Sequence, residues 1–346
     1  MDIRGATPDD LERLLPLLDD AFIFGRQRTV SLRHRFPAVF RRDNLENLLL
    51  CLHGKEILSA LAIRRFILRE NGEHWRGAMI GAVYTRPEQR GQGLASRLLE
   101  TAAQRLRADG ADFGVLWTTQ PGFYARLGWV AADCGMLGEM PLARTLHKNA
   151  TFPVGGGLPP SFSGRHVRSQ NLAAKAAPTG FGGICEIFGL ETRNGISGGE
   201  VTRLDAENAG EQIEALRTHW LDAATLRALP DGYRALPPPA EKVEAILLGQ
   251  EKENAAYALA GRAGESVILY EMTGHPDRFP ALWRETCRAT KRILVNERKD
   301  SPAQRWLAAN TALSWQDKPL ALWLPLSPKV DYSRIARWYI PYFDRI

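Results

Sequence analysis

The most informative segment of the sequence is Val83-Tyr84-Thr85-Arg86-Pro87-Glu88-Gln89-Arg90-Gly91-Gln92-Gly93-Leu94-Ala95-Ser96-Arg97-Leu98-Leu99. Its first residues are β-prone, a turn begins at Pro87, and from Leu94 apolar residues recur at helical spacing. The segment therefore predicts a strand, a glycine-rich turn and an amphipathic helix. Because the first N–H groups of a helix are unpaired and carry partial positive charge, it also predicts an anion site at the helix start.

The residue types around this turn suit a diphosphate. Gly91 and Gly93 have no Cβ, so a ligand could approach the backbone N–H groups closely. Ala95 is small enough to keep that space open, and the Arg90 guanidinium could add a charged contact. We therefore expect the phosphates to lie against the turn and the first helical residues, namely Arg90, Gly91, Gln92, Gly93, Leu94, Ala95 and Ser96.

The flanking sequence predicts a mixed α/β fold. A helix is expected to begin after an N-cap at Thr7 and to continue to Phe22, and the helix that starts at Leu94 should be closed by Gly110. The other predicted elements are strands at 2–4, 48–52, 57–68, 75–85, 113–117 and from 129, and a short helix at 123–127. Three meander strands that feed a strand–helix–strand unit indicate a mixed sheet with helices on both faces.

The rest of the chain predicts a linker and a second unit. Residues 135–199 contain glycine and proline clusters and are predicted to be irregular, either a lid or a flexible linker. From Val201 the element order of the first half returns, up to a last strand at 320–324, although the residue identities differ. The predicted organisation is a first domain at 1–140, a linker or lid at 141–199, and a degenerate second domain at 200–346.

Composition limits the class of protein. With 45 Lys and Arg against 39 Asp and Glu, the 346-residue chain has a formal charge of +6, which suits an anionic partner without requiring one. The four cysteines form no C-x-x-C pair and the histidines show no metal-ligand spacing, so we expect neither a disulfide framework nor a metal. There is no secretory signal and no apolar run of about 18 residues, so we expect a cytoplasmic protein without a membrane span.

Two motifs resemble those of the GNAT superfamily of CoA-dependent N-acyltransferases. The diphosphate motif of that family is Arg or Gln, two residues, Gly, one residue, then Gly or Ala, and Arg90-Gly91-Gln92-Gly93-Leu94-Ala95 fits it. The second motif of the family is Phe-Tyr-x-x-x-Gly-Phe, which Phe123-Tyr124-Ala125-Arg126-Leu127-Gly128-Trp129 resembles.

The resemblance implies acetyl-CoA as acyl donor and a mixed, mostly antiparallel sheet with a β-bulge. The strands that end near Thr85 and Trp117 would splay apart to admit pantetheine, whose amides would pair with the backbone of Val83 and Thr85. The resemblance also implies that Tyr124 donates a proton to the departing CoA thiolate. A packed aromatic at a helix–strand corner is the alternative role for this tyrosine.

The layout of the chain also resembles the enhanced-intracellular-survival acetyltransferases of mycobacteria. These enzymes have tandem GNAT units and a terminal carboxylate that acts as base. The strand at 75–83 has no internal carboxylate, so the resemblance implies Ile346 as the base, although the chain is too short for that family's complete third domain. In the second unit, Pro280 and Trp283 stand where the CoA motif needs small residues. We therefore predict one CoA site, with the second unit forming a wall of the acceptor pocket.

Together the motifs predict transfer of an acetyl group from acetyl-CoA to a primary amine on a small molecule or peptide. Three alternatives stay open: a tandem-GNAT enzyme that takes an acyl or aminoacyl group from tRNA, a non-catalytic acetyl-CoA sensor, and a structural module without ligand. The arginines between 26 and 42 could bind RNA or an acidic acceptor, but a solvated helix face is their usual explanation. We therefore expect neither nucleic acid nor a membrane as partner. The acceptor and the oligomeric state do not follow from the sequence.

Overall fold

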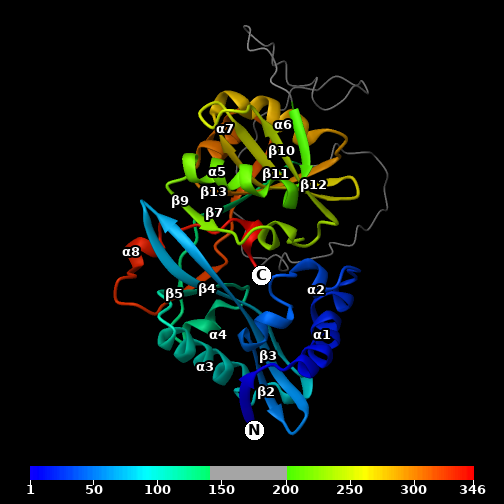
Figure 1. The fold of residues 1–346 in the computed structure, drawn as a ribbon, viewed down its shortest axis with the longest axis vertical. Helices are drawn as coiled ribbons and strands as arrows, with labels where there is room; N and C mark the ends of the chain where they lie inside the picture. Colours follow the sequence, from blue (N-terminus) through cyan, green and yellow to red (C-terminus); the bar gives the residue numbers. More distant parts are fainter. Residues whose placement is uncertain (141–200) are drawn as a thin grey trace, which may run out of the picture.

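Two β-sheets, each covered by helices, follow one another along the long axis of the molecule (Figure 1). The structure is a computed structural model that describes residues 1–140 and 201–346. The predicted linker or lid at 141–199 lies outside the described residues. The N-terminus lies at the far end of the first sheet, whereas the C-terminus lies between the two sheets (Figure 1).

The first sheet confirms the predicted mixed, mostly antiparallel arrangement. Its one parallel pair joins β4 to β5, and the other neighbours are antiparallel. The strand order is β1 (Asp2–Gly5), β2 (Leu48–His53), β3 (Glu56–Glu70), β4 (Glu73–Thr85), β5 (Phe113–Trp117), β15 (Ala321–Pro325) and β6 (Val130–Ala131), with β9 (Ala223–Leu226) paired to the outer end of β3.

Helices cover both faces of this sheet because its strands alternate their side chains. In β2, Leu48 and Leu50 pack with α1 (Pro8–Phe22) and α2 (Leu32–Arg35). Leu49 and Cys51 point to the opposite face and pack with α3 (Leu94–Ala108). The predicted N-cap Thr7 is present, with the Asp10 side chain closing a capping box. The short helices on this side of the molecule are η1 (Phe24–Arg26), η2 (Arg42–Asn47), η3 (Pro87–Gln89) and α4 (Pro121–Ala125).

The second sheet repeats the topology of the first. Its parallel pair joins β12 to β13, as β4 joins β5. The strand order is β14 (Ser314–Asp317), β7 (Gly135–Met140), β13 (Arg292–Arg298), β12 (Ser266–Gly274), β11 (Ala256–Ala263), β10 (Lys242–Leu248) and β8 (Val201–Asp205). Its helices are α5 (Gly210–Trp220), α6 (Phe279–Cys287), α7 (Pro302–Asn310), η4 (Ala206–Ala209), η5 (Asp231–Arg234) and η6 (Pro276–Arg278), and the tail adds α8 (Tyr332–Ile335) and η7 (Tyr342–Asp344).

The two halves of the chain exchange strands: β9 and β15 join the first sheet, and β7 joins the second. β15, from the end of the chain, lies between β5 and β6 of the first sheet, whereas β7 lies between β13 and β14 of the second. Two sequence predictions are therefore corrected. Residues 135–140 are not irregular but form β7, in which Gly138 leaves room for the Trp315 ring, 3.0 Å from where a Cβ would lie. The strand predicted at 320–324 exists but pairs in the first sheet, because partner choice is set by tertiary packing and not by the local pattern.

The C-terminal segment fills the junction between the sheets. Trp338 is 1% exposed, and its ring lies 4.7 Å from that of Phe113 on β5 and 5.8 Å from that of Trp323 on β15. This aromatic cluster joins the first sheet to the tail. The division into domains at 140 and 200 stays a prediction, and the exchanged strands tie the two halves together.

Candidate functional site

The first sheet opens between β4 and β5. These parallel strands pair only between Gly77–Met79 and Phe113–Val115, although β4 continues to Thr85. The β4 register against β3 shifts near Ala82, whose φ of 49° lies in the left-handed region. Such a bulge bends its strand, and the predicted splay is therefore present. Among the described strands none pairs with β4 on this side beyond Met79, and Val83 and Thr85 lie on that stretch.

The turn between β4 and α3 presents backbone groups to open space. Gly91 and Gly93 have φ values of 80° and 74°, and a Cβ added at either would meet no heavy atom within 4 Å. No side chain of the described residues caps the first turn of α3, and that turn contains no acidic residue. The exposed Arg90 donates from Nε to the Thr85 carbonyl oxygen at 3.3 Å, which keeps its guanidinium beside the turn. These features fit a diphosphate.

The residues that follow differ in what they can offer a ligand. The Gln92 side chain donates to the Gln89 Oε1 at 3.1 Å and so stays within the turn. The Leu94 side chain is 2% exposed and packs into the core, which leaves its backbone as the part near the turn. Ala95 and Ser96 are half-buried at the start of α3. The structure thus brings the predicted diphosphate residues together at one helix start.

Tyr124 lies on α4, on the other side of the splay. Its ring packs edge-on against Phe123 at 4.9 Å and Trp129 at 6.2 Å between ring centroids. Burial alone raises the pKa of the Tyr124 phenol above its ordinary value, so the hydroxyl keeps its proton and can act as a donor. The residue is half-buried and lines the cavity at the splay.

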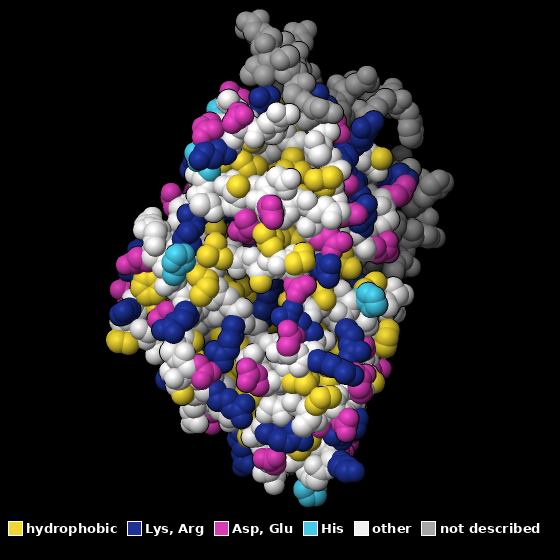
Figure 2. All heavy atoms as spheres, viewed as in Figure 1, with side chains coloured by type: hydrophobic (Ala, Val, Ile, Leu, Met, Phe, Trp, Pro, Cys, Tyr) yellow, Lys and Arg dark blue, Asp and Glu magenta, His cyan; other side chains and the backbone are white. Residues whose placement is uncertain are grey.

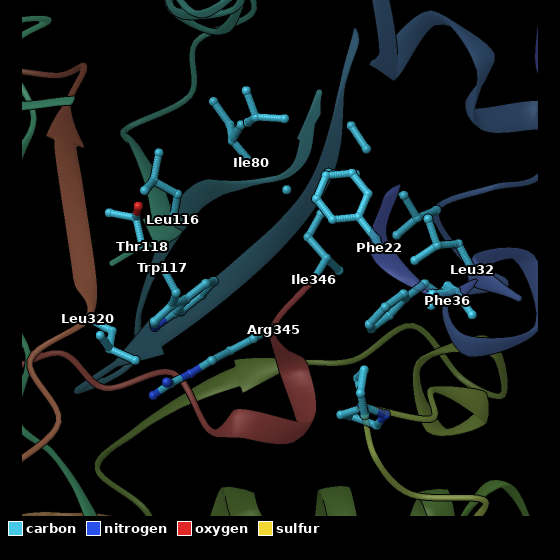
Figure 3. Close-up of a pocket in the computed structure, with 18 of the residues that line it drawn as sticks. Phe22, Leu32, Phe36, Ile80, Leu116, Trp117, Thr118, Leu320, Arg345 and Ile346 are labelled. Carbon is cyan, nitrogen blue, oxygen red and sulfur yellow. The ribbon is translucent and has the colours of Figure 1, made fainter. Parts of the chain in front are cut away.

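The cavity has a volume of about 490 Å³ and lies where the two halves of the chain meet. Its walls come from the splayed strands, from the α1–α2 segment and from the tail (Figure 3). Phe22, Leu32 and Phe36 form one wall, and Trp117, Thr118 and Leu320 lie across from them (Figure 3). This volume is in the range of sites that hold small molecules.

Ile346 lies in the same cavity as Tyr124. A Cβ built on Gly81 of β4 would come within 2.8 Å of the Ile346 carbonyl oxygen and 2.9 Å of its carbonyl carbon. The glycine at 81 therefore lets the main chain of Ile346 rest against the splayed strand. The structure thus places both predicted catalytic residues around one space.

Asp344 anchors the tail that carries Ile346. Its carboxylate accepts from Arg227 Nη2 at 3.1 Å and from the Thr225 hydroxyl, and lies 3.7 Å from Arg217 Nη2. Its backbone oxygen accepts from Arg64 Nη1 at 2.9 Å. Burial would raise the pKa of Asp344, but Arg227 and Arg217 outweigh it and hold this pKa below the ordinary value.

The sequence analysis missed this ion network and most of the cavity wall. Arg217 and Arg227 each also contact Glu271 Oε2, at 3.0 and 3.1 Å. Glu271 stands between apolar residues in β12, and a charge inside an otherwise apolar strand is the one signal that could have revealed it. The cavity residues Phe22, Arg28, Trp117 and Arg345 come from four separate elements, and no local pattern unites them.

The second sheet offers no comparable turn. Before α6 the chain runs through η6 directly into Phe279, which is 1% exposed, and Pro280. At the end of β13, Glu297 reaches across the corresponding splay and its Oε1 accepts from the Met272 N–H at 3.3 Å. The predicted single CoA site is consistent with this closed geometry.

The described residues were also considered as metal ligands and as membrane spans, and they form neither. They contain no group of three or more His, Cys, Asp or Glu side chains arranged to hold a metal ion. None of the helices in the described ranges is both long enough and apolar enough to cross a membrane.

Comparison with known proteins identifies the fold. A family profile described as an acetyltransferase (GNAT) domain matches residues 2–132. Three solved structures share the fold over nearly the whole chain. A GCN5-related N-acetyltransferase from Kribbella flavida is 16% identical, with a TM-score of 0.61 over 93% of this chain and 70% of that one. A GCN5-related N-acetyltransferase from Anabaena variabilis is 12% identical, with a TM-score of 0.63 over 94% of this chain and 73% of that one. Eis1 from Mycobacterium abscessus is 13% identical, with a TM-score of 0.57 over 94% of this chain and 74% of that one. A search of curated proteins finds no match.

Proposed function

From a chain whose residues 2–132 match a GNAT acetyltransferase domain profile, we propose an N-acetyltransferase that transfers the acetyl group of acetyl-CoA to a primary amine. The observation that carries the proposal is the open glycine turn at Gly91 and Gly93, next to the splay between β4 and β5. The turn supplies an anion site, and the splay leads from it to a cavity that holds a protonated tyrosine.

The donor is proposed to lie along the splay. Its diphosphate would accept hydrogen bonds from N–H groups at the start of α3, with Arg90 adding a positive charge. The backbone of Val83 and Thr85 would pair with the pantetheine amides in the manner of an added strand. Thr85 can serve here because the contact uses only main-chain atoms.

In the proposed reaction the neutral amine attacks the thioester carbonyl carbon. A C–N bond forms, the C–S bond breaks, and the amine loses one proton. Backbone N–H groups at the splayed end of β4 would stabilise the oxyanion of the tetrahedral intermediate. Tyr124 would donate a proton to the departing thiolate, and the upward shift of its pKa by burial means that it holds this proton beforehand.

Ile346 is the proposed base. Its main-chain carboxyl group would take the proton from the amine, directly or through water. The contact between Ile346 and Gly81 supports this role, because it lies on the splayed strand where the thioester would end. The isolated cysteines favour a reducing compartment, so the cytoplasm is the proposed location.

Two glycine variants test the proposal. Gly93→Ala adds a Cβ in front of the helix start, and Gly54→Ala is its matched control. Gly54 also has positive φ, 58°, and its added Cβ also meets nothing within 4 Å, but it lies in the turn between β2 and β3. Both changes carry the same backbone strain, about 1 kcal/mol. Only Gly93→Ala should weaken acetyl-CoA binding in calorimetry, by roughly tenfold.

Turnover separates the proposal from its alternatives. CoA released with a panel of amines is measured with a thiol reagent. Release that depends on the amine supports the enzyme, whereas binding of acetyl-CoA without release for any amine indicates a sensor. If acetyl-CoA gives no heat and no thermal stabilisation, the proposed site is wrong.

A further inference from the structure

The charged side chains around the cavity are all of one sign, and the main-chain carboxyl group of Ile346, the proposed base, is the negative group beside them. Arg26, Arg28 and Arg345 line it, and no Asp or Glu is found among the described residues that do so. Elsewhere the surface is different, since basic and acidic side chains are interspersed over the face seen in Figure 2. The cavity is therefore electropositive in a way that the +6 of the whole chain does not explain.

These guanidinium groups lack anionic partners. Within the described part of the chain, none of the three forms an ion pair with a carboxylate. The Nε of Arg28 is buried without a hydrogen-bond partner among residues 1–140 and 201–346, and so is the indole Nε1 of Trp117, which also lines the cavity. Buried donors are normally satisfied, so two residues of the cavity wall each carry an unmet donor. An acceptor-rich group in the cavity would satisfy them once these side chains turn toward it.

Packing holds Arg345 at the cavity rather than letting it extend into solvent. Its guanidinium lies over the Trp117 ring at 4.9 Å and over the Tyr342 ring at 5.7 Å. Its Nε donates to the Ile340 carbonyl oxygen at 3.1 Å, and the two terminal nitrogens remain for a ligand. In Figure 3 the side chain extends beneath Trp117.

The arginines lie on the acceptor side of the sheet. Gly91 and Gly93 precede α3, which packs on one face of the first sheet with Leu49 and Cys51. Arg28 follows α1, and Ile346 packs with α1 on the opposite face. A donor that reaches the splay from the α3 face would leave the arginine side of the cavity to the second substrate.

We propose that the acceptor is an amine that also carries an anionic group, a carboxylate or a phosphate, on an apolar body. This inference rests on the proposed function and specifies its second substrate. The anion would accept from Arg28, Arg345 and the Trp117 indole, and the apolar body would contact Phe22 and Phe36. The same positive charges would lower the pKa of the bound ammonium, so that more of it is in the neutral form that attacks the thioester.

Matched pairs of amines test the inference. Phenylalanine is compared with phenethylamine, leucine with 3-methylbutylamine, and phosphoethanolamine with ethanolamine. For each pair we measure kcat/KM by CoA release, and the binding of the N-acetylated products to the enzyme–CoA complex by calorimetry. In at least one pair the anionic member should be favoured by roughly 10- to 100-fold, the usual gain from charge-assisted hydrogen bonds. Preference in an amino-acid pair identifies a carboxylate, and preference in the third pair identifies a phosphate.

A variant pair locates the recognition. Arg28→Gln should remove most of this preference while leaving acetyl-CoA affinity unchanged. Arg33→Gln, in the same segment, loses the same charge from an exposed residue that pairs with Glu12, and should retain the preference. Arg28→Lys keeps the positive charge but loses the paired nitrogens of the guanidinium group, so it should retain part of the preference for the anionic amine.

The outcome distinguishes this inference from the proposed function. Suppose that acetyl-CoA binds but, in all three pairs, the amine without a carboxylate or phosphate has a kcat/KM equal to or above that of its partner. The inference is then wrong and the acetyltransferase proposal stands. The inference is equally wrong if no product of any pair binds. If acetyl-CoA itself does not bind, the proposed function fails first.

Discussion

Replacing Asp344 by asparagine should destabilise the protein by about 3 kcal/mol, the lower end of the cost of breaking a buried ion pair. The carboxylate is 1% exposed, and it balances Arg217 and Arg227, whose side chains are both 1% exposed. After the change, the two buried guanidinium groups would share Glu271, with Glu214 a further 4.0 Å from Arg217 Nε. Asparagine keeps one acceptor oxygen, which is why we expect the lower end of the range.

The pH dependence of this loss has a defined sign. The pKa of Asp344 in the folded protein lies below its ordinary value of 3.8, so the ionised form is favoured by folding. Its contribution to stability is complete above the unfolded pKa and is lost as pH falls through the lower folded pKa. The difference in unfolding free energy between wild type and variant should therefore be constant from pH 8 to pH 5 and shrink only in more acidic solution.

Urea unfolding followed by tryptophan fluorescence measures this difference. Asp43→Asn is the control, because Asp43 is 65% exposed in its pair with Arg41 and should contribute less than about 0.5 kcal/mol. Ile346 is two residues from Asp344, so kcat should also fall in the variant while acetyl-CoA affinity is retained. A loss below about 1 kcal/mol, or an equal loss in the control, would refute the assignment of Asp344 as the anchor of the tail.

Three further predictions address single features of the site and the second sheet. Tyr124→Phe should lower kcat by roughly 100-fold or more with acetyl-CoA affinity nearly unchanged in calorimetry, and an equal loss of both would indicate a structural role. Gly81→Ala should push the main chain of Ile346 away and cost about 1–3 kcal/mol in urea unfolding, whereas Gly122→Ala, where nothing lies within 4 Å, should cost no stability. Burial raises the pKa of Glu297 to about 7, so its favourable contribution is complete below its unfolded pKa near 4.5 and is lost as pH rises to about 7. Between these two pH values the unfolding free energy of Glu297→Gln, measured in urea, should rise by about 2–3 kcal/mol relative to that of wild type. A difference that does not change with pH would contradict the raised pKa of Glu297.

Local signals in the sequence were enough to predict the strands that residues 1–140 give to the first sheet, and the open glycine turn before α3. The strand at 113–117 was predicted with the observed bounds, because an apolar run stands between Gly110 and a polar segment. The turn was predictable because the chemistry of Gly91 and Gly93 depends on residues adjacent in sequence. The exchanged strands were not predictable, because the hydrophobic patterns of β7 and β15 are compatible with pairing in either sheet.

The arginine-lined side of the cavity could not be predicted, for a physical reason. Arg28 and Arg345 are 317 positions apart and meet at the cavity only because the tail packs between the sheets. In the sequence, a solvated helix face was the simpler explanation for the arginines between 26 and 42. What distinguishes Arg28 is the absence of a partner for its buried Nε among the described residues, and only coordinates can reveal that.

The two sheets show how one topology can be open in one copy and closed in the other. Both contain a parallel strand pair that separates after a few residues. In the first, two glycines with positive φ leave the helix start uncovered. In the second, Pro280 provides no N–H at the helix start, and Glu297 occupies the N–H of Met272. That carboxyl group also accepts from the Arg298 N–H at 3.1 Å and from the Ser301 hydroxyl at 2.9 Å, so hydrogen bonds of the protein itself satisfy it. The second copy is therefore free to serve as a wall, and it contributes Pro237, Pro238 and the tail to the cavity of the first.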